Sequence, residues 1–372
     1  MTGIYALVHM AVDLSCAFLV YTYVLGGEQW YLWLLLYNFC AFALQMPIGA
    51  AADRLDRNSC VAVGGCAGVL AGLLFGIAGF PSGAAVVAGI GNACFHVGGG
   101  IDVLNRSERR AAPLGIFVAP GALGIFLGTM LGRAGTEAAV WISGLLILSA
   151  VVIRAAAGRE KLWLTSGNAP FSFSVPSSSV PSSSVPSSPM PSSSVPSGRT
   201  RMAAACFLAA VILRSYSGMI QNFPWKETLA GSGLILAGAV VLGKMAGGVL
   251  ADKWGIQRTA FRSMCAAAVG FLCLVYPAAG ILAVFFWNMS MPLTLWAVSK
   301  VFPGAKGFGF GLLTFGLFVG FCPAWLGGSS VGGPVQSGIR FMAGNASTPV
   351  GMALMAVASL LLLGWGLKQV AE

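Results

Sequence analysis

Apolar runs of about 20 residues recur along this chain, and they constrain its fold more than any other feature. A helix of that length spans the hydrocarbon core of a bilayer. Twelve runs are found, near 3–24, 30–51, 59–80, 82–103, 113–132, 137–156, 202–222, 230–251, 261–279, 281–302, 307–327 and 348–368. Only 9% of the residues are charged, against about 25% in soluble domains. The sequence therefore predicts a polytopic α-helical membrane protein whose solvent is the lipid bilayer.

The runs form two groups of six, separated by a Ser/Pro-rich segment. A Val-Pro-Ser-Ser-Ser repeat begins at Val175 and decays near Pro189. Such a composition cannot bury a core and is typical of disorder. We predict an N-terminal six-helix bundle over 1–158, a disordered cytoplasmic linker over 159–201 and a C-terminal six-helix bundle over 202–372. A passive tether explains the linker more simply than a docking or phosphorylated segment does.

The placement of Lys and Arg predicts the orientation of the chain. If the N-terminus is cytoplasmic, the outer loops hold only Arg133, Lys226 and Arg340, and the other loop Lys and Arg residues are cytoplasmic. This asymmetry follows the positive-inside rule, so the net charge of +10 reflects topology and not a nucleic-acid partner. We expect a monomeric, multi-pass protein of the cell membrane, in bacteria the inner membrane, with both termini cytoplasmic.

The cysteines predict neither a disulfide framework nor a metal site. None of the nine forms a C-x-x-C pair, and most lie inside apolar runs, where cysteine behaves as a small hydrophobic residue. We expect no metal and no cofactor.

Two loops share a motif at equivalent places in the two halves. The first reads GAAADRLDR from Gly49 to Arg57, and the second reads GVLADKWGIQR from Gly248 to Arg258. Their repetition indicates an internal duplication. The Gly permits close helix packing, the Asp is suited to cap a neighbouring helix end, and the basic residues suit the headgroup region. The candidate gating residues are Gly49, Asp53, Arg54, Arg57, Gly248, Asp252, Lys253 and Arg258.

This loop resembles the signature of the major facilitator superfamily, and the resemblance covers the whole chain. It implies twelve transmembrane helices in two pseudo-symmetric six-helix bundles. It also implies that the loop latches the cytoplasmic side of the outward-open state, which gives Asp53 and Asp252 a gating role. The first copy departs from the pattern at Asp56, where a Gly is usual.

A narrower resemblance links the first half to the fosmidomycin-resistance branch of that superfamily. The first run contains His9 and Asp13 in the pattern His-x-x-x-Asp, and the fourth contains GIGNACFH, ending at His96. In that branch the Phe-His is commonly followed by Pro-Glu and then an Arg, whereas here Val97 and three glycines follow. The antibiotic substrate is therefore not carried over.

The fifth run faintly resembles the Gly/Pro-rich fifth-helix motif of antiporters in the superfamily. Its motif residues are Gly115, Pro120, Gly121, Gly124 and Gly128. A packing face with a proline kink and a bend used in gating both explain this pattern.

Polar residues fall on the first, fourth, seventh and tenth runs, which line the central cavity in this fold. Intramembrane charge is costly and normally faces protein or a water-filled cavity. The proton-coupling candidates are Asp13, His9, His96 and Asp102, and the substrate-cavity candidates are Arg214, Asn92, Tyr216, Trp287 and Asn288.

Two of these candidates, His9 and Asp13, are four residues apart and share a helix face. They form either a structural pair in which each side chain satisfies the other, or a proton-carrying group and a neighbour that adjusts its proton affinity. Asp13 lies on the first run and Arg214 on the seventh, which are the equivalent first helices of the two repeats. A pseudo-two-fold axis along the membrane normal therefore places both residues at a similar depth. Arg214 therefore either pairs with Asp13 or receives an anionic substrate group. Lys244 lies within a few residues of a cytoplasmic loop and can snorkel towards the surface, so we interpret it as a structural residue.

These features predict a secondary active transporter. No G-x-x-x-x-G-K-[ST] loop is found, which argues against direct ATP drive. We expect proton-coupled movement of a small organic solute by rocker-switch alternating access, with export favoured by the narrower resemblance alone. The alternatives are an uptake permease of the same fold and a non-transporting membrane sensor or scaffold. No Ser/His or metal-ligand constellation supports an intramembrane enzyme.

Overall fold

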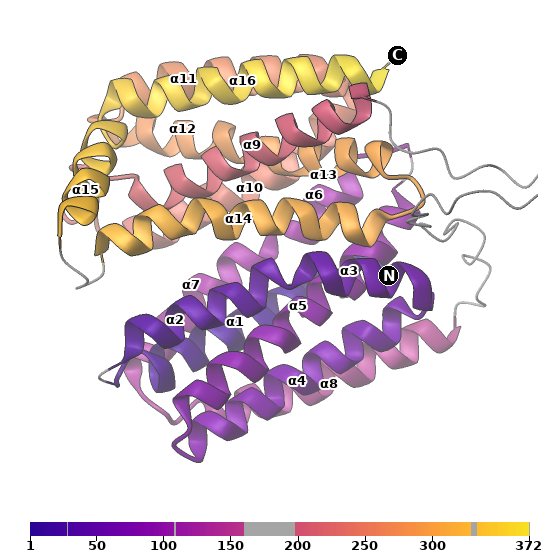
Figure 1. Ribbon diagram of the computed structural model, residues 1–372. Helices are drawn as coiled ribbons and strands as arrows, with labels where there is room; N and C mark the ends of the chain where they lie inside the picture. Colours follow the sequence, from indigo (N-terminus) through magenta and orange to yellow (C-terminus); the bar gives the residue numbers. More distant parts are fainter. Residues whose placement is uncertain (28, 108, 160–197, 329–332, 372) are drawn as a thin grey trace, which may run out of the picture.

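The computed structural model describes residues 1–372 apart from 28, 108, 160–197, 329–332 and 372. Figure 1 shows two helical bundles packed side by side, the first in indigo to magenta and the second in rose to yellow. Each bundle comes from one half of the chain. Nearly all of the predicted linker lies outside the described residues.

The N-terminal bundle contains six membrane-crossing segments, several of which are interrupted. Its elements are α1 (Thr2–Leu19) with the π-helical turn η1 (Val20–Val24), α2 (Trp30–Asn38) with η2 (Phe39–Ala43) and α3 (Gln45–Leu55), α4 (Asn58–Ile77), α5 (Pro81–Arg106), α6 (Ala112–Val118) with α7 (Pro120–Ala134), and α8 (Ala139–Arg159).

The C-terminal bundle repeats this pattern and adds one short helix. Its elements are α9 (Gly198–Ile220), α10 (Ser232–Trp254), α11 (Ile256–Leu272), α12 (Pro277–Asn288) with α13 (Ser290–Val301), α14 (Lys306–Gly328), α15 (Pro334–Ala346) and α16 (Pro349–Ala371). Helix α9 begins four residues before the predicted start of the second bundle at 202.

The predicted fold class is confirmed. Within the described residues, eleven segments are long and apolar enough to cross a membrane. The ninth predicted run corresponds to α11, which has 17 residues and packs along α12 and α16 as part of the second bundle. The protein is therefore an all-α, multi-pass membrane protein with a six-plus-six arrangement.

Helix α15 has no counterpart among the predicted runs. It contains no buried residue, and Val335, Phe341 and Met342 are all exposed. Figure 1 places it at the end of the second bundle away from the two termini. Its 13 residues are too few to span a bilayer, so the apolar-run criterion could not detect it.

Small residues let the helices of the first bundle approach closely. Added Cβ atoms at Gly124 and Gly128 would collide with the backbone of α1 at Met10 and Leu14. Backbone approach of this kind is the usual basis of helix association in membranes. For these two glycines the structure supports the packing-face interpretation of the fifth run.

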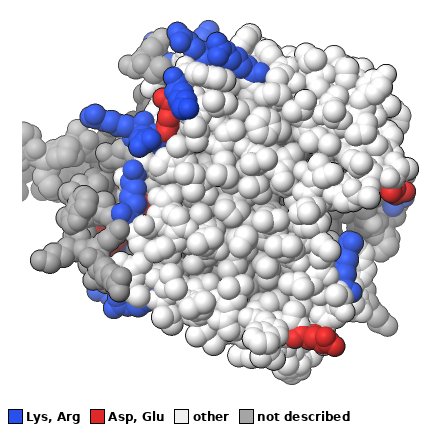
Figure 2. All heavy atoms as spheres, turned by 180° about the vertical axis from the view of Figure 1, so that it is seen from behind, with Lys and Arg blue, Asp and Glu red and all other residues white. Residues whose placement is uncertain are grey.

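Basic side chains gather at one end of the molecule, as Figure 2 shows beside the grey atoms. We call this the charged end. Its Lys and Arg residues lie at helix ends and in the adjoining loops and include Arg54, Arg57, Arg110, Lys253, Arg258 and Lys300. The opposite end carries Arg133, Lys226 and Arg340.

Candidate functional site

Two histidines and an aspartate meet inside the first bundle. His9 and Asp13 lie on α1 and His96 lies on α5, and all three side chains are buried. His9 Nε2 is 3.1 Å from Asp13 Oδ2, and His96 Nε2 is 3.5 Å from Asp13 Oδ1. The two Nε2 atoms are 2.9 Å apart. We call His9, Asp13 and His96 the triad.

The outer nitrogens of both imidazoles face backbone carbonyl oxygens. His9 Nδ1 is 2.8 Å from Phe117 O, and His96 Nδ1 is 2.9 Å from Asn92 O. A carbonyl only accepts hydrogen bonds, so both Nδ1 atoms must carry a hydrogen. Each neutral ring would then present a lone pair at Nε2. Two lone pairs at a hydrogen-bond distance repel, so a proton between them is the simplest way to satisfy this geometry.

A proton shared by the two Nε2 atoms also suits Asp13. The carboxylate contacts both rings, and Asn92 Nδ2 donates to its Oδ1 over 3.4 Å. One imidazolium and one carboxylate cancel in charge, which lowers the cost of burying either. The geometry of the triad is therefore compatible with one proton held among its three groups.

The break between α6 and α7 provides one of these carbonyls. Pro120 has no N–H, and the described backbone here lacks the usual bonds from 121 to 117 and from 122 to 118. Ala122 N donates to Ala119 O instead. The Phe117 and Val118 carbonyls are thus released from the helix ladder, as is expected beside a proline.

The released carbonyls receive side chains from both bundles. His9 of the first bundle donates to Phe117 O, and Lys244 Nζ of the second bundle donates to Val118 O over 3.2 Å. Lys244 also interacts electrostatically with Asp13 and with Arg214. Lys244 therefore does not snorkel towards the surface in this structure, because its ammonium group points to the proline break.

Arg214 lies on α9 and does not pair with Asp13. Asp13 contacts the two histidines and Asn92, whereas Arg214 Nη1 contacts Thr294 Oγ1 at 3.5 Å. Among the residues that the structure describes, no carboxylate lies within ion-pair distance of Arg214. The predicted pairing of Asp13 with Arg214 is absent from this conformation.

The remaining sequence candidates surround this region without joining the triad. Asp102 accepts a 2.6 Å hydrogen bond from Tyr5 Oη. Asn288 Nδ2 donates to the Val284 carbonyl of its own helix, and Trp287 packs its ring against Phe271. Tyr216 is half-buried on α9. Asn92 is the substrate-cavity candidate that contacts the triad directly.

The two motif aspartates cap helices of the opposite bundle. Asp53 accepts hydrogen bonds from Gly307 N at 2.8 Å and Phe308 N at 2.9 Å, at the start of α14. Asp252 accepts from Ala111 N at 2.6 Å and Ala112 N at 3.2 Å, at the start of α6. A carboxylate at a helix N-terminus satisfies free amides and the helix dipole. The charged end is thus closed by two equivalent contacts between bundles.

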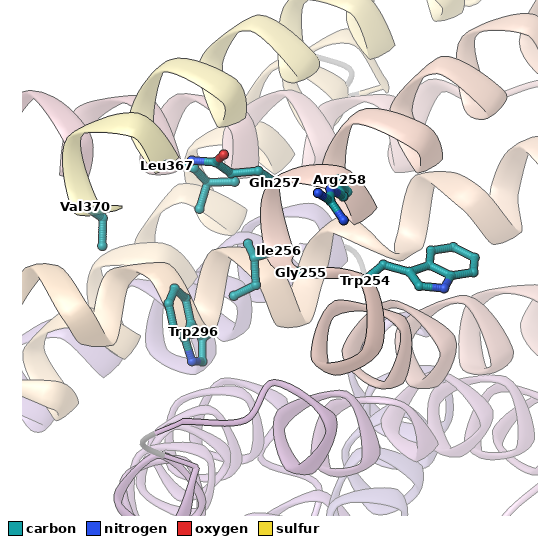
Figure 3. Close-up of a pocket in the computed structure, with 8 residues that line it drawn as sticks. All are labelled: Trp254, Gly255, Ile256, Gln257, Arg258, Trp296, Leu367 and Val370. Atoms are coloured by element: carbon teal, nitrogen blue, oxygen red, sulfur yellow. The ribbon is translucent and has the colours of Figure 1, made fainter. Parts of the chain in front are cut away.

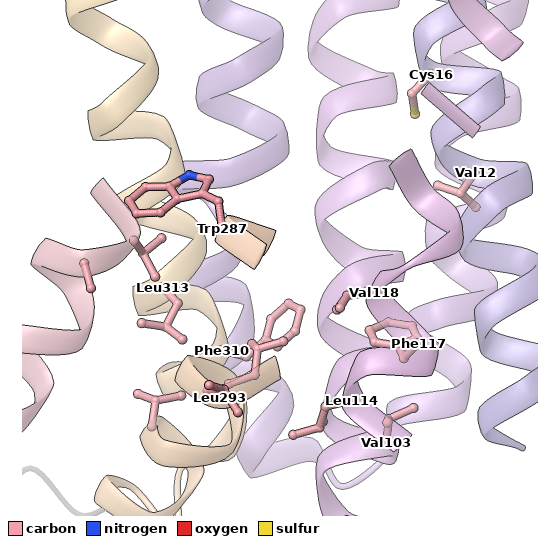
Figure 4. Packing of buried hydrophobic residues seen from close by; sticks show 14 of the residues in the cluster. Val12, Cys16, Val103, Leu114, Phe117, Val118, Trp287, Leu293, Phe310 and Leu313 are labelled. Carbon is pink, nitrogen blue, oxygen red and sulfur yellow. The ribbon is translucent and has the colours of Figure 1, made fainter. Parts of the chain in front are cut away.

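Close backbone packing accompanies these contacts. An added Cβ at Gly49 would collide with the Gly307 carbonyl, and one at Gly248 would collide with the Ala111 carbonyl. The Phe310 ring lies against Gly100 of the first bundle; Figure 4 shows it between the two bundles, beside Val118. Four motif side chains, Arg54, Arg57, Lys253 and Arg258, are instead exposed at the charged end.

A surface hollow of about 380 Å³ lies at the charged end, away from the triad. Figure 3 shows its lining by Trp254, Arg258, Trp296 and Leu367, among other residues. No proton-coupling or substrate-cavity candidate lines it.

The triad has a donor set that could hold a metal ion. Its two imidazole nitrogens and one carboxylate oxygen lie within 4.8 Å of one another, and imidazole suits several transition metals. Sequence reasoning did not bring these residues together, because His96 is 83 positions from Asp13 and only the packing of α1 on α5 joins them. Sequence reasoning also missed the contact of Lys244 with Val118 O, although Pro120 indicates a break at which backbone carbonyls are free to accept hydrogen bonds.

Comparisons with known proteins agree with this architecture. No curated protein matches the chain in sequence. The E. coli fucose:proton symporter FucP, as a point variant, superposes with a TM-score of 0.67 at 12% identity, covering 99% of this chain and 97% of that chain. A second FucP structure, in the outward conformation, gives 0.60 at 12% identity, with 98% and 99% covered.

A bacterial homologue of the iron transporter ferroportin, in an outward-facing state, gives a TM-score of 0.52 at 11% identity, with 100% of each chain covered. At such identities the likeness concerns the fold alone. The sequence profile of the Major Facilitator Superfamily matches residues 1–325. The family and these folds belong to transporters and not to enzymes. This chain is a member of the Major Facilitator Superfamily.

Proposed function

We propose that the protein is a secondary active transporter that couples proton movement to the movement of a small organic solute by alternating access. One observation carries the coupling: the 2.9 Å contact between His9 Nε2 and His96 Nε2, with both Nδ1 atoms committed to carbonyls. This arrangement is stable with a bound proton and unstable without one. Gain or loss of the proton should therefore change the packing of α1 against α5.

Other titratable groups also act on the triad. Lys244 on α10, Cys16 on α1 and Tyr37 on α2 all interact electrostatically with Asp13. Lys244 is the cationic member of this group and belongs to the other bundle. Since the bundles move relative to each other in alternating access, movement of Lys244 would change the proton affinity of the triad. This gives a physical link between conformation and proton binding.

The charged end is the proposed cytoplasmic side, because Lys and Arg are concentrated there. Its closure by Asp53 and Asp252 then corresponds to a conformation closed towards the cytoplasm. Export is the direction favoured by the fosmidomycin-resistance resemblance alone. Uptake, the alternative direction, is an outcome of the flux experiment below.

The coupling can be tested without knowing the solute. The chain has two histidines, and both belong to the triad. Protein labelled with ¹⁵N-histidine and freed of any affinity tag should give NMR signals from these two rings only. We expect protonated Nδ1 in both rings and one Nε2 proton shared between them near neutral pH.

Two other spectra would contradict this assignment. Two neutral rings without an Nε2 proton would exclude the shared proton. Signals that appear only after addition of Zn²⁺ or Mn²⁺, and vanish with a chelator, would assign the triad to metal binding. Asp13→Asn should remove the counter-ion and abolish the shared-proton signal, while Glu137→Gln, at an exposed carboxylate, should leave it unchanged.

Transport itself requires a ligand. A thermal-shift screen on purified protein would supply candidate solutes, and proteoliposomes with an imposed pH gradient would measure their flux. Asp13→Asn should abolish gradient-driven accumulation while solute exchange continues. Unchanged accumulation with unchanged pH dependence would exclude Asp13 as the coupling site. A complete absence of flux for every bound ligand would favour a sensor or scaffold.

A further inference from the structure

We propose that Arg214 and Lys244 bind the anionic group of the transported solute, so that the substrate class is a small organic anion. The inference rests on the proposed transport function and specifies its substrate. It starts from the charges inside the membrane. Arg214 lies on α9 and Lys244 on α10, each at least six residues from the nearer end of its helix. Both are half-buried, and the two interact electrostatically.

Within the described residues, neither cation has an acidic partner at contact distance. Arg214 has five N–H donors, and its described side-chain contact is the 3.5 Å approach to Thr294 Oγ1. Lys244 gives one hydrogen to Val118 O, which leaves two. In the part of the chain that the structure describes, the ion pairs of Asp13 are with His9 and His96. Neither cation shares such a contact.

The charges of this region do not balance. Asp13 and one imidazolium cancel, so the protonated triad contributes zero. Arg214 and Lys244 together contribute +2. Unpaired charges inside a membrane protein are costly unless water or a counter-ion reaches them. Both side chains are partly exposed, and an anion is the solute that would lower the energy of these charges most.

The two cations differ in ways that suit one anionic group. The guanidinium is a planar fork that binds carboxylate or phosphoryl oxygens in a bidentate manner. The ammonium is a compact charge that is fixed at the proline break by Val118 O. A carboxylate, phosphoryl or sulfonate group held by Arg214 would meet Lys244 as a second contact. These groups share the chemistry that the site recognises, and the test separates them.

Anion binding and proton binding should support each other. Without its proton the triad carries a net charge of −1 close to Lys244, and this charge repels an incoming anion. Protonation removes that repulsion. Lys244 interacts electrostatically with both Asp13 and Arg214, so each event can act on the other through it. Mutual support of this kind favours movement of the proton and the anion in the same direction.

The first test needs no ligand. If Arg214 lacks an acidic partner, then Arg214→Gln removes an uncompensated charge and should leave the melting temperature of the purified protein unchanged or higher. A structural ion pair would instead make the variant markedly less stable. Lys244→Gln should behave in the same way. Lys226→Gln, at an exposed position, is the matched control for the loss of one positive charge.

The second test uses defined probes at constant ionic strength: benzoate, phenylphosphonate and benzenesulfonate, each compared with neutral benzamide. We expect the anions to stabilise the wild-type protein and benzamide to have no effect. Arg214→Gln should lower affinity for the binding anion about a hundredfold, which corresponds to about 2.8 kcal/mol. Arg214→Lys should lower it less, because it keeps the charge and loses the fork.

Three outcomes would overturn the proposal: no stabilisation by any anion, equal stabilisation by benzamide, or unchanged anion affinity in Arg214→Gln. Failure of the transport proposal looks different. Anion binding that persists without any flux under a pH gradient would refute coupled transport and leave the anion site intact. Gradient-driven flux of a neutral solute in Arg214→Gln would refute the anion site and leave coupled transport intact.

Discussion

The contact of Asp53 with α14 should decide how firmly the charged end is closed. Asp53 is 5% exposed, and its two oxygens accept from the amides of Gly307 and Phe308. Asn at this position keeps one acceptor, turns an NH2 group towards the second amide and removes the charge. A hydrogen bond to a charged group contributes about 1.5–3 kcal/mol. Loss of one such bond and weakening of the other should total roughly 3 kcal/mol, or about a 150-fold shift towards the open charged end.

The equivalent change at Asp252 should have a smaller effect. Its side chain is 18% exposed and also contacts Arg110, itself 74% exposed. Solvent screens such contacts, and its second amide bond, to Ala112, is long at 3.2 Å. We expect about 1 kcal/mol from Asp252→Asn. The ranking of the two variants follows from burial, since their sequence motifs are nearly the same.

Distances between spin labels would measure this opening. Cys60 at the start of α4 and Phe261→Cys on α11 are exposed and belong to different bundles; the other cysteines would be removed. Asp53→Asn should add a longer distance that dominates the distribution, with solute affinity largely retained. A distribution unchanged by Asp53→Asn, or a larger change from Asp252→Asn, would refute the reasoning. A large loss of solute affinity with unchanged turnover would contradict a latch role for either residue.

Three further predictions concern the triad and the linker. Pro120→Ala should let the fifth segment form continuous helix bonds and withdraw the Phe117 and Val118 carbonyls, which would be seen as altered ¹⁵N-histidine spectra and weaker coupling. Gly121→Ala should separate the triad, because a Cβ there would overlap Asp13 Oδ2 and His9 Nε2. Gly144→Ala, at a position with open space around it, is the control. Equal coupling in both variants would argue against a contact of Gly121 with the triad. Replacing 170–197 by a Gly/Ser chain of equal length should preserve transport, and loss of flux at normal membrane expression would show another role for the repeat.

Much of the fold follows from the sequence alone. Run length and the paired GxxAD motifs predicted the two bundles, and the family and fold comparisons confirm a major facilitator transporter and not an enzyme. The finer relation to the fosmidomycin-resistance branch stays a prediction. Breaks within segments were harder to locate, because π-helical turns such as η1 and η2 leave no marker in apolar sequence. Pro120 marks its break plainly.

The site was only partly predictable. Spacing placed His9 beside Asp13, since residues four apart share a helix face. Depth alone suggested Asp13 and Arg214 as partners, but it does not fix which way each helix is rotated about its axis. In the structure, the orientation of α1 about its axis directs Asp13 towards His96 on α5. The orientation of α10 likewise directs Lys244 inward, although Lys244 is close enough to the helix end to snorkel.

The proline break is where the chemistry of the two bundles meets. A continuous helix would keep both the Phe117 and the Val118 carbonyl within its own ladder. The break offers one to His9, whose ring carries the proposed proton, and the next to Lys244, which contributes to the proposed anion site. The two carbonyls belong to adjacent peptide groups that are joined at the Cα atom of Val118. We therefore expect a change in the packing of α10 against this segment to act on His9 across a single residue, which would link bundle movement to proton binding.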